Sequence, residues 1–337
     1  MNFEDELKTA QATAEKLIRR YLPDEKTTPG RLAEAMNYSV LAGGKRVRPV
    51  RMLKTYEMYG GDDEGLIGPF AAAIEMIHTS SLVHDDLPEI DGDLYRRGRK
   101  TTHAVYGPAL GVLAGDALMN YAYETAVMAC CRDIPEDEAA GTSEKAADAS
   151  GAMRTDAETA AAPGDHAEED STRNGRVMRS LSVLLTRTGI RGMLGGQSVD
   201  VENEKNGTLQ FPKETLDYIY LHKTAALIEA PLMIGAILGG APEKDTEVLE
   251  QVGRKAGLAF QIRDDVLDVT KTTEEIGKPA GSDEKNGKTT YVTLLGVSGA
   301  DREAQRLTDE AAALLDGLSP DVRFLREYLD RLARRSR

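Results

Sequence analysis

Apolar residues recur three and four positions apart along most of the chain, which is the period of an α-helix with one buried face. The segments with this pattern lie near residues 4–20, 31–42, 66–86, 110–131, 176–199, 213–238, 245–269 and 301–334. Alternating, strand-like runs are few. Typical helix-ending residues follow several segments, at Gly43-Gly44, Gly60-Gly61 and Gly239-Gly240-Ala241-Pro242. The pattern therefore predicts an all-α protein.

One stretch, residues 133–173, lacks this helical pattern. It holds twelve Asp or Glu residues against three Lys or Arg, which accounts for −9 of the net charge of −14 and leaves −5 for the other residues. Its only large apolar residues are Ile134 and Met153, so it has too little apolar surface to offset the entropy lost on ordering. We expect one domain over residues 1–337, interrupted by a flexible acidic insertion.

The composition argues against several classes of protein. A nucleic-acid-binding protein normally has a basic face, whereas the net charge here is −14. The acidic start of the chain does not resemble a secretory signal, and the apolar run 225–240 is interrupted by Glu229 and Pro231 and is too short to span a bilayer. Cys130 and Cys131 are adjacent and cannot form a disulfide framework. These features predict a cytoplasmic protein with no transmembrane segment and no nucleic-acid partner.

The first of two acidic motifs reads His84-Asp85-Asp86-Leu87-Pro88-Glu89-Ile90-Asp91. Pro88 disfavours helical geometry at Leu87, so the helix that carries Asp85 and Asp86 should end there. Asp91 can then fold back toward them from the following loop. We therefore expect three carboxylates to converge on one spot.

The second acidic motif reads Phe260-Gln261-Ile262-Arg263-Asp264-Asp265-Val266-Leu267-Asp268. At 3.6 residues per turn, one face of a helix collects Gln261 and the three aspartates. Like charges at such spacings destabilise an isolated helix, so a cation should compensate them. Carboxylates without Cys or His partners suit Mg²⁺ that also binds substrate phosphates. A single Asp-Asp pair is more often a solvated surface feature, but two matched motifs favour a metal site.

Basic residues that could complement a diphosphate cluster in Gly43-Gly44-Lys45-Arg46-Val47-Arg48-Pro49 and in Arg96-Arg97-Gly98-Arg99-Lys100. Arginine binds phosphate oxygens through two parallel hydrogen bonds, and lysine supplies a point charge. His78 lies seven residues before Asp85, on the same face of the predicted helix. Further polar candidates lie elsewhere in the chain: Gln197, Asp200, Lys223, Thr224, Lys278 and Lys288.

Together and in this order, these motifs resemble the polyprenyl synthetase family, and within it the bacterial farnesyl and geranylgeranyl diphosphate synthases. The matching pieces are residues 43–49, 84–91, 96–98, 195–200, 223–224, 260–268 and 287–291. They span nearly the whole chain. The resemblance implies an isoprenoid synthase type I helical bundle around a central cavity, and a homodimer. The core of a helical bundle is a natural place for such a site.

The resemblance also implies a role for each matched residue. Metal ligands would be Asp85, Asp86, Asp91 and Asp264, supported by Asp265 and Asp268. The allylic diphosphate would contact Arg96, Lys223, Lys278 and Lys288, and isopentenyl diphosphate would contact Lys45, Arg48, His78 and Arg97. The reacting carbons would be flanked by Gln197, Thr224 and Gln261. Roughly two to three Mg²⁺ ions would serve each active site as the cofactor.

The chemistry implied by the resemblance joins isopentenyl diphosphate to an allylic diphosphate and releases pyrophosphate. Mg²⁺ and the basic side chains would stabilise the charge that develops on the departing pyrophosphate. Isopentenyl diphosphate would attack the allylic carbocation, and loss of a proton would restore the double bond. No nucleophilic Ser or Cys is needed.

Product length should depend on side chains along the helix that carries Asp85, where one turn of about 5.4 Å is similar to one isoprene unit. In the bacterial farnesyl synthases the position five residues before the first aspartate is usually aromatic, whereas here it is Ser80. This small residue favours a twenty-carbon product and leaves a fifteen-carbon product open. Ile77 and Met76 are candidates for a deeper floor, and Ser80→Tyr is expected to shorten the product.

Two alternative functions remain open from the sequence. A class I terpene cyclase shares the implied fold and ionises an allylic diphosphate, but it has no second diphosphate to bind. Lys45, Arg48, His78 and Arg97 together argue against it. A non-catalytic subunit of a prenyl synthase commonly lacks one acidic motif, and both motifs are intact here.

Overall fold

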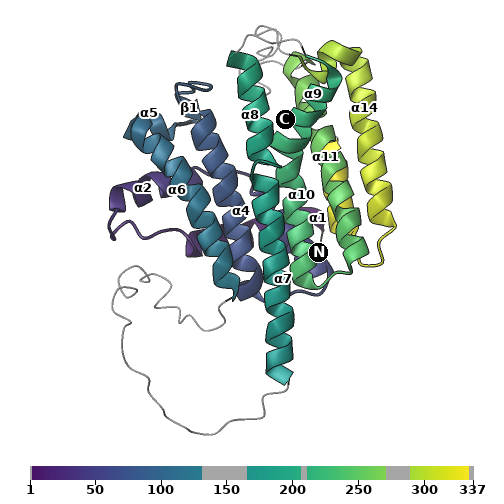
Figure 1. Cartoon of the computed structure of the whole chain (residues 1–337). Helices are drawn as coiled ribbons and strands as arrows, with labels where there is room; N and C mark the ends of the chain where they lie inside the picture. Colours follow the sequence, from purple (N-terminus) through teal and green to yellow (C-terminus); the bar gives the residue numbers. More distant parts are fainter. Residues whose placement is uncertain (1, 131–164, 206–210, 271–288, 334–337) are drawn as a thin grey trace.

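The computed structural model describes residues 2–130, 165–205, 211–270 and 289–333, most of which lie in long helices packed side by side (Figure 1). The helices are α1 (Phe3–Arg20), α2 (Gly30–Val40), α3 (Val47–Met58), α4 (Glu64–Asp85), α5 (Thr102–Tyr106), α6 (Pro108–Val127), α7 (Asp165–Thr188), α8 (Met193–Lys205), α9 (Lys213–Ile219), α10 (Ala226–Gly239), α11 (Glu243–Thr270), α14 (Tyr291–Asp316) and α15 (Arg323–Ala333). A 3₁₀ turn, Met128–Cys130, follows α6, and a π-helix, Tyr220–Ala225, joins α9 to α10. Within the described ranges the one sheet is a short hairpin of β1 (Tyr95–Arg96) and β2 (Arg99–Lys100). The predicted all-α fold is confirmed.

The core has a main part around α4 and α10 and a smaller part that supports the second acidic motif. Every residue from Ala226 to Leu238 on α10 is buried, and this helix packs against α3, α4, α7 and α11. In the smaller part, Ile219, Ile262, Tyr291 and Leu307 bring α9, α11 and α14 together. Each acidic motif therefore lies on a helix that is fixed by its own apolar contacts.

Two helical stretches are apolar enough, by length and composition alone, to cross a membrane. They are Glu64–Asp85 and Lys213–Gly239, each with a mean hydropathy of 1.4. The bundle buries 83% and 78% of their most apolar stretches, respectively, which is the burial of core helices. The apolar run 225–240 is the buried helix that the sequence predicts.

The structure differs from the predicted segments near several glycines and prolines. The predicted segments omit α3, although the helix-ending pair Gly60-Gly61 follows it; Pro49 lies in its first turn, where proline is tolerated. The segment predicted at 176–199 is divided between α7 and α8 at Gly189 and Gly192, and the segment 301–334 is divided between α14 and α15 near Gly317.

The predicted acidic insertion falls largely outside the described residues. Residues 131–164 are not described, whereas residues 165–173, at its end, belong to α7. α7 therefore begins inside the stretch predicted as the insertion, because a helix can begin in a polar stretch when later turns supply its buried face. Val177, Leu181 and Leu184 are the buried residues that anchor α7.

Candidate active site

The first acidic motif has the geometry that its proline predicts. α4 ends at Asp85, and the chain turns so that the Asp91 backbone N–H donates to the Asp85 carbonyl oxygen at 2.9 Å. A second hydrogen bond closes the turn, from the Gly92 N–H to the Leu87 carbonyl oxygen at 3.0 Å. The predicted return of Asp91 toward the helix end is confirmed.

Asp86 is buried and paired with an arginine in this structure. Its Oδ1 lies 2.7 Å from Nε and 2.6 Å from Nη2 of Arg96, on β1. Burial raises the pKa of Asp86, although the Arg96 guanidinium acts in the opposite direction. The structure thus joins a predicted metal ligand to a residue predicted to bind the allylic diphosphate.

The Asp85 carboxylate lies where helices distant in sequence meet. Gln197 on α8 donates from Nε2 to Asp85 Oδ1 at 2.6 Å. Burial raises the pKa of Asp85 to about 6, since the attraction of Lys223 is outweighed by burial together with the repulsion from Asp91. A carboxylate in these surroundings gains more than an exposed one from a bound cation.

Lys223 and Thr224 lie in the π-helix, a rare widened turn that often occurs at functional sites. Nζ of Lys223 lies 2.6 Å from Oδ2 of Asp200 on α8. Burial acts to lower the pKa of Lys223, but the carboxylates of Asp200, Asp85 and Asp91 together raise it. Its ammonium group is therefore charged and directed into the carboxylate cluster.

A close approach of α8 to the π-helix makes these contacts possible. A Cβ atom added to Gly196 would lie 2.2 Å from the backbone nitrogen of Lys223, closer than any side chain tolerates. Glycine at this position lets Gln197 reach Asp85 and lets Asp200 reach Lys223.

Gly196→Ala is expected to lower kcat by about tenfold to a hundredfold, because the added methyl group pushes α8 away from the π-helix and misplaces catalytic side chains. Steady-state kinetics and thermal unfolding of the purified variant test this. The matched control is Gly175→Ala on α7, where an added Cβ meets nothing within 4 Å. Unchanged kcat in the Gly196 variant would show that the close approach is unimportant.

The second acidic motif lies on α11 and is linked to the π-helix. Thr224 Oγ1 donates to Gln261 Oε1 at 3.1 Å. Asp264 is half-buried and lies three residues further along α11, on the same face as Gln261. Asp268 is buried, with 2% of its surface exposed. The predicted diphosphate contacts of the next segment, Lys278 and Lys288, lie outside the described residues.

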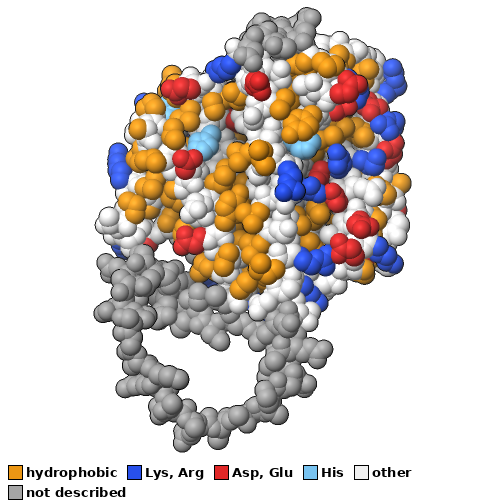
Figure 2. Space-filling model, in the orientation of Figure 1, with side chains coloured by type: hydrophobic (Ala, Val, Ile, Leu, Met, Phe, Trp, Pro, Cys, Tyr) orange, Lys and Arg blue, Asp and Glu red, His pale blue; other side chains and the backbone are white. Residues whose placement is uncertain are grey.

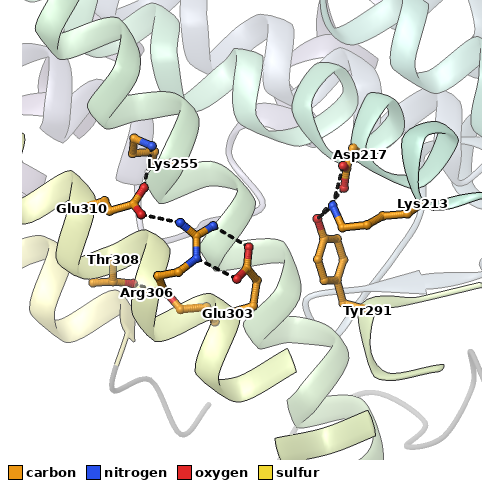
Figure 3. A network of polar contacts seen from close by, with 9 residues as sticks. Lys213, Asp217, Lys255, Tyr291, Glu303, Arg306, Thr308 and Glu310 are labelled. Carbon is orange, nitrogen blue, oxygen red and sulfur yellow. Dashed lines mark hydrogen bonds and ion pairs between the residues drawn. The ribbon is translucent and has the colours of Figure 1, made fainter. Parts of the chain in front are cut away.

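Asp265 fixes the start of α14. Its two carboxylate oxygens lie 2.9 and 2.8 Å from the Tyr220 hydroxyl, and one of them accepts the Tyr291 backbone N–H at 3.0 Å. The Tyr291 hydroxyl donates to Asp217 and lies 3.0 Å from Lys213 Nζ (Figure 3). These contacts fit the supporting role expected for Asp265 better than that of a direct metal ligand.

A cavity of about 620 Å³, here called the basic cavity, contains all four residues predicted to bind isopentenyl diphosphate: Lys45, Arg48, His78 and Arg97. Burial, followed by the charge of Arg48 and other nearby arginines, keeps the pKa of His78 well below its ordinary value, so the imidazole is neutral. Burial also lowers the pKa of Arg48 to about 10, which leaves it charged at neutral pH.

A second cavity of about 440 Å³, here called the carboxylate cavity, lies beside the first acidic motif. Its wall includes Asp85, Gln197, Lys223 and Thr224, and the apolar side chains Leu82, Leu87, Ile90, Met119, Met193 and Leu227. Arg48 and His78 line both cavities. Hence the two cavities adjoin. Of the predicted metal ligands, only Asp85 is among the described residues that line them, whereas Asp86, Asp91 and Asp264 are not.

The residues predicted to control product length, Ser80, Ile77 and Met76, do not line either cavity. Ser80 is fully buried and donates from Oγ to the Ile77 carbonyl oxygen at 2.8 Å, while Ile77 and Met76 are packed in the core. None of the three is among the described residues that line either cavity, whereas Ser81 lines the carboxylate cavity. A position five residues before Asp85 is rotated by about 140° around the helix, and one four residues before by about 40°. Ser80, Ile77 and Met76 therefore lie outside the walls of these two cavities, and their effect on product length stays a prediction.

Glu75 is a buried residue of the basic cavity that sequence reasoning misses. Glu75 on α4 lines this cavity and is 1% exposed. A signal for it exists, because Glu75 is the only acidic residue in the apolar run from Leu66 to Val83. Buried charges are rare unless they are paired, so such a residue predicts a buried cationic partner.

Comparison with known proteins places these motifs in a family. Residues 29–148 and 169–316 match the family Polyprenyl synthetase. "Geranylgeranyl pyrophosphate synthase 9, chloroplastic" of Arabidopsis thaliana is 40% identical over 293 residues, covering 87% of this chain and 70% of the relative. "Dimethylallyltranstransferase" of Fischerella ambigua is 41% identical over 283 residues, covering 84% of this chain and 70% of the relative.

Solved structures agree in fold. The crystal structure of an FPP/GFPP synthase from Zymomonas mobilis matches with a TM-score of 0.74 and 29% identity, covering 99% of this chain and 98% of that one. A putative farnesyl-diphosphate synthase from Marinomonas matches with a TM-score of 0.71 and 25% identity, covering 99% of both chains. With its two acidic motifs and its helical bundle, this chain belongs to the polyprenyl synthetase family.

Proposed function

We propose that the chain is a short-chain prenyl diphosphate synthase that joins isopentenyl diphosphate to an allylic diphosphate and releases pyrophosphate. The observation that carries this proposal is the pair of adjoining cavities. One is lined by basic side chains and the other by the first acidic motif, and Arg48 and His78 belong to both. Two diphosphates can therefore bind side by side through different chemistry, as the reaction requires.

Isopentenyl diphosphate is assigned to the basic cavity. Lys45, Arg48 and Arg97 supply cations, and the arginines can each form two parallel hydrogen bonds to phosphate oxygens. His78 is neutral and offers one N–H donor without adding charge. The substrate is thus held by its diphosphate with its double bond toward the carboxylate cavity.

Magnesium is the cofactor proposed for the carboxylate cavity. Across the part of the chain that the structure describes, no three His, Cys, Asp or Glu side chains gather closely enough to hold a metal ion by themselves. The prediction that three carboxylates converge on one spot is therefore wrong for this structure. Mg²⁺ typically takes one or two protein carboxylates and completes its shell with water and substrate phosphates, so a looser set of ligands is sufficient for the proposal. The ligands proposed are Asp85, Asp91 and Asp264, and the bound ions would neutralise charge on the allylic diphosphate.

Arg96 and Asp86 are assigned linked roles. Arg96 neutralises Asp86 in this structure, and the allylic diphosphate is a stronger anion for the same guanidinium. If the Arg96 guanidinium exchanged Asp86 for the substrate diphosphate as its partner, the Asp86 carboxylate would become available to the metal. This arrangement couples binding of the allylic diphosphate to completion of the acidic site.

The chain's own residues then favour breakage of the allylic carbon–oxygen bond. Lys223 and Arg96 place positive charge where the departing pyrophosphate gains negative charge. Gln197 and Thr224 line the carboxylate cavity, where their uncharged oxygens would lie beside the reacting carbons. The apolar side chains of the same wall would exclude water from the allylic cation. Isopentenyl diphosphate, fixed by His78 and Arg48, attacks this cation, and its proton leaves with the pyrophosphate.

A homodimer in the cytoplasm completes the proposal. Large apolar side chains are exposed on neighbouring helices: Leu113 and Val127 on α6, Met178 and Leu185 on α7, and Ile190 between α7 and α8. Figure 2 shows hydrophobic side chains gathered on the face over these helices. An apolar surface of this kind is typical of an interface between subunits. The adjacent pair Cys130 and Cys131 suits a reducing compartment.

Product analysis tests the proposed reaction. The purified chain is incubated with Mg²⁺, isopentenyl diphosphate and, in turn, the five-, ten- and fifteen-carbon allylic diphosphates, and dephosphorylated products are identified by chromatography. Linear elongated prenols are expected. Cyclised hydrocarbons formed without isopentenyl diphosphate would identify a terpene cyclase, and the absence of any product would indicate a non-catalytic subunit.

His78→Ala and Arg97→Ala are each expected to raise KM for isopentenyl diphosphate by about tenfold or more, with a smaller change in KM for the allylic substrate. The reason is that both side chains line the basic cavity. Arg99→Ala is the matched control, because Arg99 lies in the same hairpin but stacks on Tyr38, 4.3 Å from its ring centre. A larger effect on the allylic KM would contradict the assignment.

A further inference from the structure

Strained backbone marks the basic cavity. Over the described ranges, the non-glycine residues with positive φ are Arg46, at 48°, and Arg97, at 53°, and both line this cavity. Residues with a Cβ atom rarely adopt this left-handed conformation, and it persists where surrounding contacts impose it. The two loops that carry the proposed isopentenyl diphosphate ligands are therefore each held at one strained residue.

Arg46 is held by groups from three helices. Its side chain is 3% exposed, and it donates from Nε to Glu15 Oε2 at 2.8 Å, from Nη1 to Glu75 Oε1 at 2.9 Å and from Nη2 to the Val40 carbonyl oxygen at 2.9 Å. These partners lie on α1, α4 and α2, respectively. Each of the three guanidinium nitrogens is used within the protein, so Arg46 has little capacity left to bind a substrate phosphate.

The residues next to Arg46 face the cavity. Lys45 precedes it, and Arg48 lies two positions after it in the first turn of α3. The Arg46 carbonyl oxygen accepts the Val50 N–H at 3.0 Å and so begins α3 directly from the left-handed residue. The conformation at Arg46 therefore sets the directions of both cationic side chains.

Glu75 explains why the charge of Arg46 is not shared with a ligand. It is the only carboxylate among the described residues that line the basic cavity, where it would repel a diphosphate if its charge were uncompensated. Its side chain is 2% exposed and contacts Arg46, and the two charges neutralise each other. The other carboxylate that contacts Arg46 is Glu15, which lies outside the cavity lining and also pairs with Arg19, at 2.7 Å.

We propose that Arg46, held by Glu15 and Glu75, is a positioning residue that fixes the left-handed turn and so presents Lys45 and Arg48 to isopentenyl diphosphate, without touching that substrate itself. The inference rests on the proposed function in one respect, the assignment of isopentenyl diphosphate to the basic cavity. It assigns a role to the one arginine of the Lys45–Arg48 segment whose side chain is turned into the protein.

The first test compares Arg46→Gly with Arg46→Ala. Both remove the guanidinium, but only glycine adopts positive φ without strain, so KM for isopentenyl diphosphate is expected to be about fivefold or more lower in the glycine variant than in the alanine variant. KM for the allylic diphosphate should change little in either. Thermal unfolding of both variants shows that the comparison is made on folded protein. Equal KM values for isopentenyl diphosphate in the two variants would overturn the proposal.

The second test uses Glu15→Gln, a change on the partly exposed surface that leaves the fold intact. Simple electrostatics predicts tighter binding of isopentenyl diphosphate after loss of a negative charge, whereas a positioning role predicts weaker binding, by about threefold. Isothermal titration with isopentenyl diphosphate measures the sign. Arg19→Gln, which removes the other partner of Glu15, is the matched control and should leave binding unchanged. Tighter binding in Glu15→Gln would overturn the positioning role.

Arg48→Ala distinguishes a failure of the positioning role of Arg46 from a failure of the assignment of isopentenyl diphosphate to the basic cavity. If it weakens binding of isopentenyl diphosphate while the Arg46 and Glu15 variants do not, the positioning role is wrong and the cavity assignment stands. If Arg48→Ala also has no effect, the assignment of the basic cavity is wrong, and the role proposed for Arg46 falls with it.

Discussion

Asp85→Asn and Asp264→Asn are each expected to lower turnover by about a hundredfold to a thousandfold, because each removes a carboxylate proposed to hold Mg²⁺ on the allylic diphosphate. The amide is close in size to the carboxylate, so packing should be preserved. Steady-state turnover at saturating substrates and thermal unfolding of the same preparations measure the two quantities. Removal of divalent cations with a chelator should abolish activity of the parent protein, and Mg²⁺ should restore it.

Two other aspartates serve as matched controls for this prediction. Asp116→Asn changes a residue of the same cavity wall whose side chain is 64% exposed and lies 3.5 Å from His84, and its turnover should stay near that of the parent. Asp265→Asn should instead lower the melting temperature, because that carboxylate accepts hydrogen bonds from Tyr220 and the Tyr291 backbone. The metal assignment would be refuted if both the Asp85 and Asp264 variants kept near-normal turnover and a chelator left the activity of the parent protein unchanged.

The Asp85 carboxylate should also make Mg²⁺ binding depend on pH. Burial and the neighbouring acidic residues raise the pKa of Asp85 to about 6 in the metal-free protein. Mg²⁺ binds the ionised form, so its affinity should fall as the pH drops below 6 and level off above it. Titration calorimetry with Mg²⁺ across this pH range measures the affinity of the parent and of Asp85→Asn. Loss of the pH dependence in the variant would assign it to Asp85.

Much of the fold was accessible from the sequence because the helices are long and strongly periodic. The boundaries of α1, α4 and α6 lie within a few residues of the predicted segments. The segments predicted from periodicity omit α3. Its first turn contains Pro49, and the residue that precedes it, Arg46, is left-handed and contacts Glu15 and Glu75 of distant helices. Long-range contacts of this kind leave no local pattern.

Much of the candidate site could also be predicted from the sequence, but for a different reason. Motifs specify residue types at short range, so Asp85, Gln197, Lys223 and Thr224 could be named before their contacts were known. The direction of a buried side chain on a helix is harder to predict, since one position changes it by about 100°. This is why Ser80 was placed in the cavity wall and why the role of Asp265 in holding Tyr291 was not foreseen.

Ser81→Tyr is expected to shorten the main product from twenty to fifteen carbons. Ser81 lines the carboxylate cavity one turn before Asp85, and Met119 of α6 lines it too. A tyrosine ring projecting into the cavity at this level fills the space of about one isoprene unit, since one helical turn spans about 5.4 Å. The parent should yield the twenty-carbon product when isopentenyl diphosphate is in excess.

Ser80→Tyr is the matched variant, because it places the same ring one residue earlier in a fully packed environment. Ser80 is 0% exposed, so the ring should overpack the core and cost about 1–3 kcal/mol of stability without shortening the product. Chromatography of dephosphorylated products, together with thermal unfolding, distinguishes the two. A shortened product from Ser80→Tyr and an unchanged one from Ser81→Tyr would mean that the growing chain follows the Ser80 face of α4. A parent that stops at fifteen carbons would mean that another side chain, such as Met119, already closes the cavity.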